Sequence, residues 1–205
     1  MLTFFDILLN LACLSSFIVG IGLYNNYVYQ TKVFFYFITI SLFIQIALDY
    51  CYINKINNII FFNLFNILFF LYCSYVFTKH IVNNIFIIIF LSITMSWLFY
   101  IKGIYAFNIY VFILCSLFTC VTNSILILKL VKKDDLLFNN PQFYISAGLL
   151  IFMFSMSAPL LLMNYMVIHN FKILGKFYTV FSSIVTVIVN LFYIKAFLCS
   201  KKQIS

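Results

Sequence analysis

A carboxylate inside an apolar stretch is the feature of this sequence best suited to bind something. Asp49 lies in the largely apolar run 33–53, about 6 Å along the axis from the end of that run at the rise of an α-helix. Gln45, four residues earlier, would share its helix face. An ionisable group within a membrane span is costly and usually faces the bundle interior or water. We therefore expect Asp49 to anchor a ligand, a cation or a proton, and a role in helix packing stays open.

Other polar side chains are expected at the same depth as Asp49. The predicted ligand-binding set consists of Gln45, Asp49, Asn63, Asn66, Asn164 and His169. Together these side chains would form a polar cavity that faces outward. The alternative is that the amides only bond neighbouring helices to each other, at about 1 kcal/mol or less each.

Sequence signatures of catalysis and of metal binding are missing. There is no HExxH, GxSxG or P-loop sequence, and the two histidines, His80 and His169, fall on opposite membrane faces in the expected topology. None of the six cysteines forms a CxxC pair. We predict no catalytic residue, no metal site and no cofactor, and hence a protein that is not an enzyme.

The composition requires lipid as the solvent for most of the surface. Of the 205 residues 66% are hydrophobic and only 8% are charged, too few for the polar shell of a soluble fold. A helix needs roughly 20 apolar residues to cross a bilayer. We predict an all-α bundle of seven transmembrane helices, forming a single domain over residues 1–205 with no soluble domain. The expected spans are 4–24, 33–53, 59–77, 81–100, 104–128, 143–168 and 177–198.

The distribution of lysine predicts the orientation. One side of the seven spans would hold Lys32, Lys79, Lys129, Lys132, Lys133, Lys195, Lys201 and Lys202, and the other Lys55, Lys102, Lys172 and Lys176. Because cytoplasmic loops carry the excess of basic residues, the amino terminus should lie outside and the carboxyl terminus in the cytoplasm. This placement is that of a multi-pass protein of the bacterial inner membrane. The scattered lysines, without a single arginine, also argue against a nucleic-acid partner.

Two local patterns concern the connections between spans. Asn140 is expected to cap a helix whose first residue is Pro141. In addition, the pairs Asn25-Asn26 and Asp49-Tyr50 recur as Asn139-Asn140 and Asn164-Tyr165, at offsets of 114 and 115 residues. That recurrence would relate spans one to three with spans five to seven, as in transporters built from parallel repeats. Chance recurrence in an Asn-rich chain is the other explanation.

The segments 140–150 (NPQFYISAGLL) and 192–199 (FYIKAFLC) resemble the multi-pass amino-terminal membrane regions of bacterial sensor histidine kinases. Unlike a complete kinase, the sequence ends at Ser205 without a phosphoacceptor helix or an ATP-binding domain. The resemblance implies a sensor module that responds to an extracytoplasmic or lipid-borne cue. Such a module would signal through a cytoplasmic partner or a second copy, or the sequence would be part of a longer protein.

A small solute transporter is the alternative function. Seven spans, the recurrence described above and the dipeptide Pro141-Gln142 are similar to features of the PQ-loop and SWEET families. Those families carry prolines within spans of both repeats, and here the matching position of the first half is not proline. The sensor is therefore the first hypothesis and the transporter the second.

Overall fold

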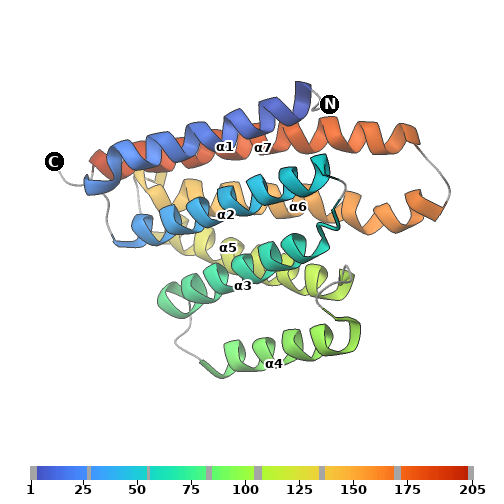
Figure 1. The fold of residues 1–205 in the computed structure, drawn as a ribbon. Coiled ribbons are helices and arrows are strands. Elements are labelled where there is room, and N and C mark those ends of the chain that lie inside the picture. Colours follow the sequence, from blue (N-terminus) through green and yellow to red (C-terminus); the bar gives the residue numbers. More distant parts are fainter. Residues whose placement is uncertain are drawn as a thin grey trace. The chain divides into compact units, whose positions relative to one another are not determined.

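The described part of the chain is entirely helical. The computed structural model describes residues 4–26, 29–54, 56–81, 85–103, 108–133, 137–168 and 172–202, with backbone only at 4–6, 26, 52, 102, 133, 158–168, 172–179 and 201–202. Within these residues there are seven α-helices and two short 3-10 turns (Figure 1). The α-helices are α1 (Phe4–Leu23), α2 (Tyr29–Ile53), α3 (Ile59–His80), α4 (Ile85–Lys102), α5 (Ile109–Lys133), α6 (Pro141–Ile168) and α7 (Lys172–Lys202), and the turns are η1 (Tyr24–Asn26) and η2 (Leu137–Asn139).

Each helix overlaps one of the seven predicted spans, but the ends around the fourth connection are shifted. The helix expected at 81–100 runs from Ile85 to Lys102, and the one expected at 104–128 begins at Ile109 and continues to Lys133. Gly103 has φ +76° and its amide donates to the carbonyl of Phe99 over 2.7 Å, which ends α4. Asn108 then accepts from the amide of Val111 over 3.3 Å and so fixes the start of α5.

The predicted start of α6 is confirmed. The helix begins at Pro141, and the side-chain oxygen of Asn140 accepts a hydrogen bond of 2.9 Å from the amide of Gln142. That amide belongs to the first turn of the helix, where it has no intrahelical acceptor. Proline at the first position loses no hydrogen bond and already has a helical φ angle.

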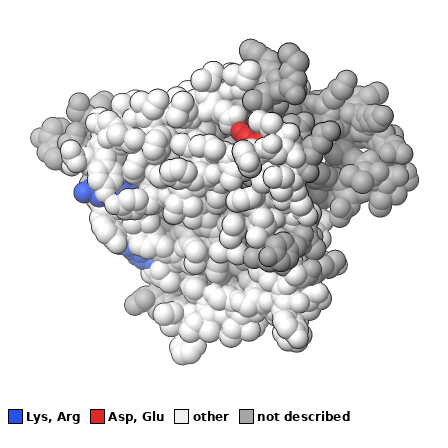
Figure 2. Space-filling view, in the orientation of Figure 1, with Lys and Arg blue, Asp and Glu red and all other residues white. Residues whose placement is uncertain are grey.

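The chain is a helical membrane protein. Four described helical segments are long and apolar enough to cross a bilayer, namely Tyr29–Cys51, Ile59–His80, Ile109–Lys132 and Val180–Ser200. The described parts of the other helices add shorter apolar stretches, Ile7–Leu23, Ile85–Ile101 and Pro141–Ser157. On the face drawn in Figure 2, the described residues carry charged side chains at only a few points.

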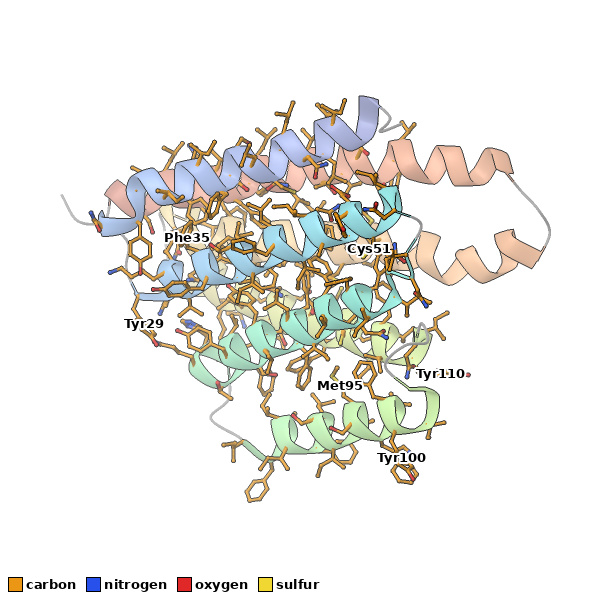
Figure 3. All side chains as sticks on the ribbon, in the orientation of Figure 1. Tyr29, Phe35, Cys51, Met95, Tyr100 and Tyr110 are labelled. Atoms are coloured by element: carbon orange, nitrogen blue, oxygen red, sulfur yellow. The ribbon has the colours of Figure 1, made fainter. Side chains whose placement is uncertain are left out.

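The exposed face of α4 is apolar and suited to contact lipid. Besides exposed isoleucines at 85, 87, 89 and 101, large exposed side chains recur every three or four residues at Phe86, Phe90, Ile93, Trp97 and Tyr100. Such spacing places them on one stripe of the helix. Tyr100 is 83% exposed and points away from the helix in Figure 3. An exposed apolar stripe of this kind is stable in hydrocarbon and would be a liability in water.

Packing divides the helices into two compact units. Unit 1 contains residues 1–36 and 127–205, and unit 2 contains residues 37–126. Helix α2 thus contributes its first turns to unit 1 and the remainder to unit 2, while α5 is divided near its end. The two units are described separately below, and the single domain expected from the sequence stays a prediction.

In unit 1, α7 packs against both α1 and α6. Phe34 of α2 lies 4.8 Å from the ring of Tyr193, measured between ring centroids, and 5.9 Å from that of Phe197. Glycines make room for such rings. A Cβ atom at Gly20 would lie 2.6 Å from the ring of Phe35, and one at Gly148 would lie 2.6 Å from the ring of Tyr193.

Unit 2 has an aromatic core of its own. The ring of Phe37 in α2 packs against Phe69 and Tyr72 of α3, with centroid distances of 4.9 and 4.8 Å. Phe118 of α5 lies between Phe70 and Phe77 of α3, at 5.6 Å from each ring centroid. These contacts hold α3 between α2 and α5, so polar groups on the facing sides of α3 and α5 are shielded from lipid.

Candidate polar sites within the two units

Asp49 and Gln45 form the hydrogen-bonded pair that their spacing predicts. The side-chain amide of Gln45 donates to a carboxylate oxygen of Asp49 over 3.0 Å, and both side chains are half-buried. A carboxylate accepts hydrogen bonds and binds cations, and the amide of Gln45 holds one of its oxygens in place.

The two asparagines of α3 are buried at the same end of unit 2. Asn63 is fully buried and Asn66 is 4% exposed. Helix α2 ends at Ile53 and α3 begins at Ile59, so the short connection keeps Asp49 and these asparagines at one end of the unit, here called the Asp49 end. The main-chain carbonyl of Asn66 accepts the thiol of Cys115 over 3.4 Å.

The other two predicted ligand-binding residues are not placed. Asn164 lies within α6, but its side chain falls outside the described residues, and His169 lies outside them altogether. Their contribution to a shared cavity stays a prediction.

Helices α3 and α5 share a row of buried polar groups that the sequence reasoning missed. Cys115, Thr119 and Asn123 follow each other at intervals of four on α5, which puts them on one face. The thiol of Cys73 donates to the hydroxyl of Thr119 over 3.4 Å, and the amide of Asn123 lies 3.9 Å from the sulfur of Cys73. This row, from Cys115 to Asn123 on α5 together with Cys73 on α3, is called the α3–α5 seam.

Helix α4 contacts the α3–α5 seam at Cys115, near the start of α5. The sulfur of Cys115 lies 3.9 Å from that of Met95, a buried residue of α4 on the side that faces α3 in Figure 3. Asn108 ties the same two helices together, because its side-chain amide donates to the carbonyl of Leu98 over 2.8 Å. Near the Asp49 end the seam is thus connected to α4, whose outward face carries Trp97.

A matching arrangement bonds α1 to α7 in unit 1. The hydroxyl of Ser16 donates to the side-chain oxygen of Asn190 over 2.6 Å. The amide of Asn190 donates to the carbonyl of Thr186 over 2.9 Å and lies 3.7 Å from the sulfur of Cys13. In the α3–α5 seam, Asn123 likewise donates to the carbonyl of Thr119, over 2.8 Å. Each unit therefore contains an Asn that bonds back four residues and touches a Cys of the neighbouring helix.

Two further polar pairs lie where α2 and α6 begin and α7 ends. The hydroxyls of Thr31 and Ser200 are buried and 2.7 Å apart, and the amide of Gln142 donates to the side-chain oxygen of Gln30 over 3.3 Å. Gln30 is the second residue of α2 and Gln142 is the second residue of α6. These pairs bond the first turns of α2 to α7 and to α6.

Sequence spacing alone could have found only part of this chemistry. The four-residue intervals on α5 can be recognised in the sequence. The roles of Cys73 and Asn190, however, depend on contacts with residues 50 and 177 positions away. Among the described residues, no three His, Cys, Asp or Glu side chains are grouped so as to hold a metal ion.

No family model, curated protein or solved structure matches this chain. The resemblance to sensor histidine kinases therefore depends on the segments 140–150 and 192–199 alone.

Proposed function

We propose that the chain is a non-catalytic membrane sensor with seven spans, an outside amino terminus and a cytoplasmic carboxyl terminus in the bacterial inner membrane. Seven helices that overlap the seven expected spans support this topology. The lysine distribution supports its direction. In this topology the Asp49 end of unit 2 faces outward, and the last turn of α7 faces the cytoplasm.

The observation that carries the proposal is the continuity of polar groups from the Asp49 end along the α3–α5 seam. The Gln45–Asp49 pair provides an anionic acceptor in the outer half of the unit. At the same end of the unit, Asn66 and Cys115 begin a row that continues through Thr119 to Asn123 on α5. Polar contacts in a span have few alternative partners in lipid, so a ligand that displaces one of them changes the packing of two helices.

The chemistry of the Asp49 end defines the cue. A carboxylate with a neutral amide partner selects a cation, a proton or a ligand rich in hydrogen-bond donors. Anionic ligands would have to overcome its charge. The cue is therefore a cationic or donor-rich molecule that reaches the outer half of the membrane from the periplasmic side or from lipid.

The single tryptophan offers a direct test in the unlabelled protein. Trp97 lies on α4, which the contacts of Met95 and Asn108 tie to α5. In lipid nanodiscs, we expect amine-containing solutes or a change in pH to shift the fluorescence of Trp97, and Asp49→Asn to abolish the shift. Asn at position 49 can still bond to Gln45, so this variant removes charge and retains the pair. An identical response of the wild type and the variant would contradict the proposed site.

A seven-helix solute transporter is the second candidate, and the repeated geometry favours it. A 3-10 turn precedes both α2 and α6, and their second residues, Gln30 and Gln142, contact each other. If α1–α3 correspond to α5–α7, the α3–α5 pair corresponds to the α7–α1 pair. Both pairs contain an Asn–Cys contact, with the two residue types exchanged between corresponding helices. Parallel repeats of this kind are typical of transporter folds.

Flux separates the two candidates. The purified chain would be reconstituted in liposomes that contain a mixture of labelled sugars, amino acids and amines. Sustained counterflow that Asp49→Asn eliminates would establish transport and contradict the sensor. A fluorescence response of Trp97 without counterflow would support the sensor.

A further inference from the structure

The geometry points to a binding site for the phosphate of an anionic phospholipid headgroup at Lys32, Tyr24 and Tyr36 of unit 1. This site is separate from the Asp49 end and does not depend on the proposed sensor function. Tyr24 belongs to η1, directly after α1, and the other two residues belong to the first turns of α2.

The three side chains are joined to one another. The hydroxyls of Tyr24 and Tyr36 form a hydrogen bond, and the ammonium of Lys32 lies 5.3 Å from the centroid of the Tyr24 ring. The ring holds the ammonium by a cation–π contact, which fixes its direction without neutralising it. A carboxylate partner, in contrast, would cancel the charge.

The cluster combines a phenol pair with an ammonium. When Tyr24 donates to Tyr36, the hydroxyl proton of Tyr36 is left to donate to an outside acceptor. The ammonium adds further N–H donors and a positive charge, and among the described residues Lys32 makes no ion pair. A phosphate oxyanion is the acceptor that suits one hydroxyl and one ammonium.

No described carboxylate competes for this position. Asp49 is the one acidic residue whose side chain the structure describes, and it lies on the same helix as Lys32. The two are 17 residues apart, which is about 25 Å along a helix. An anion bound at Lys32 would therefore come from outside the described side chains.

The surroundings indicate that the anion belongs to a lipid. Tyr36 is 52% exposed, and Ile40 and Phe43 continue the exposed side of α2 toward its middle. Residues 36, 40 and 43 share one helix face. A headgroup phosphate at Lys32 and Tyr36 would thus place its acyl chains along an apolar stripe, whereas free phosphate would use only the polar end of the stripe.

The test is native mass spectrometry of the full chain released from nanodiscs with equal phosphatidylglycerol and phosphatidylcholine. We expect the wild type to retain phosphatidylglycerol preferentially and Lys32→Gln to reduce that preference about fivefold. Tyr36→Phe should reduce it about twofold, since one donor is lost. Lys195→Gln is the matched control, because Lys195 is an exposed lysine of the same unit and should leave the preference unchanged.

Further arms decide the source of the phosphate and guard against misfolding. Lys32→Arg retains the charge and should retain the preference, and an unchanged unfolding temperature of Lys32→Gln would exclude a fold defect as the cause of its loss. Millimolar inorganic phosphate, added to the lipid-free protein in detergent, should leave no adduct. A phosphate adduct that requires Lys32 would keep the site and assign it to free phosphate. Equal effects of Lys32→Gln and Lys195→Gln, without any phosphate adduct, would overturn the proposal.

Discussion

Ser16 and Asn190, 174 positions apart in the chain, are joined by a buried hydrogen bond of 2.6 Å that bonds α1 to α7. The same asparagine bonds back to the carbonyl of Thr186 and contacts Cys13. One side chain thus satisfies its own amide and connects two helices of unit 1. Its replacement should affect stability and helix proximity in ways that can be measured separately.

Removal of the asparagine should destabilise unit 1. Asn190→Leu keeps a similar volume but removes this acceptor of Ser16, whose hydroxyl is left with the carbonyl of Cys13 at 2.9 Å, so the loss should be about 1 kcal/mol. The measurement is unfolding in mixed micelles at increasing denaturant. Ser16→Ala in the Asn190→Leu background should restore part of the loss, since both polar partners are then absent. Strictly additive effects of the two substitutions would show that the bond is not formed.

The proximity of α1 and α7 can be measured with a native cysteine. In Asn190→Cys, the new thiol replaces an amide that lies 3.7 Å from the sulfur of Cys13. We expect mild oxidation to form an intramolecular disulfide, detected by intact mass and by reversal with a reductant. Cys13→Ser in the same background is the control and should abolish the product. Failure to form the disulfide would place the two helices farther apart than described.

Two glycines of α1, two residues apart, should respond oppositely to alanine. At Gly20 a Cβ would lie 2.6 Å from the ring of Phe35, whereas at Gly22 nothing lies within 4 Å. Gly20→Ala should therefore lower stability by about 1 to 3 kcal/mol through overpacking. Gly22→Ala should raise it by about 0.5 to 1 kcal/mol, because alanine favours the helix. Thermal unfolding of both variants gives the comparison, and equal shifts would contradict the close packing at Phe35.

The start of α6 provides a test of a local interaction. Asn140→Ala removes the acceptor for the amide of Gln142 and should cost about 1 kcal/mol. Asn139→Ala, at the exposed neighbouring position, should have little effect and serves as the control. Unfolding of both variants in the same detergent is the measurement. A larger loss at Asn139 than at Asn140 would exclude the cap.

The fold was predictable where a single segment determines the outcome. Apolar length indicated all seven helices, and Asn140 with Pro141 gave the start of α6, because both depend on neighbours in sequence. The end of α4 depends on the left-handed conformation of Gly103, which the neighbouring residues in the sequence do not indicate. The spacing of Gln45 and Asp49 was sufficient for their bond, since both lie on one helix face.

Contacts between distant helices were not predictable in the same way. An apolar span has polar residues at many positions, and any of them can face lipid, a neighbour or a ligand. The α3–α5 seam forms only because α3 and α5 place Cys73 opposite Thr119 and Asn123. The cavity expected from six polar residues stays a prediction. The Gln45–Asp49 pair and the buried asparagines of α3 lie at one end of unit 2, and the side chains of Asn164 and His169 lie outside the described residues.

The absence of side chains at Gly20 and Gly148 restricts how α7 can move. The ring of Tyr193 on α7 fills the space that a side chain at Gly148 of α6 would take. The ring of Phe197, also on α7, comes close to Gly20 of α1. Turning α7 about its own axis would drive both rings against neighbours that carry side chains. Tilting it outward would keep the rings clear of them. This packing favours tilting of α7 as a rigid body over rotation about its own axis.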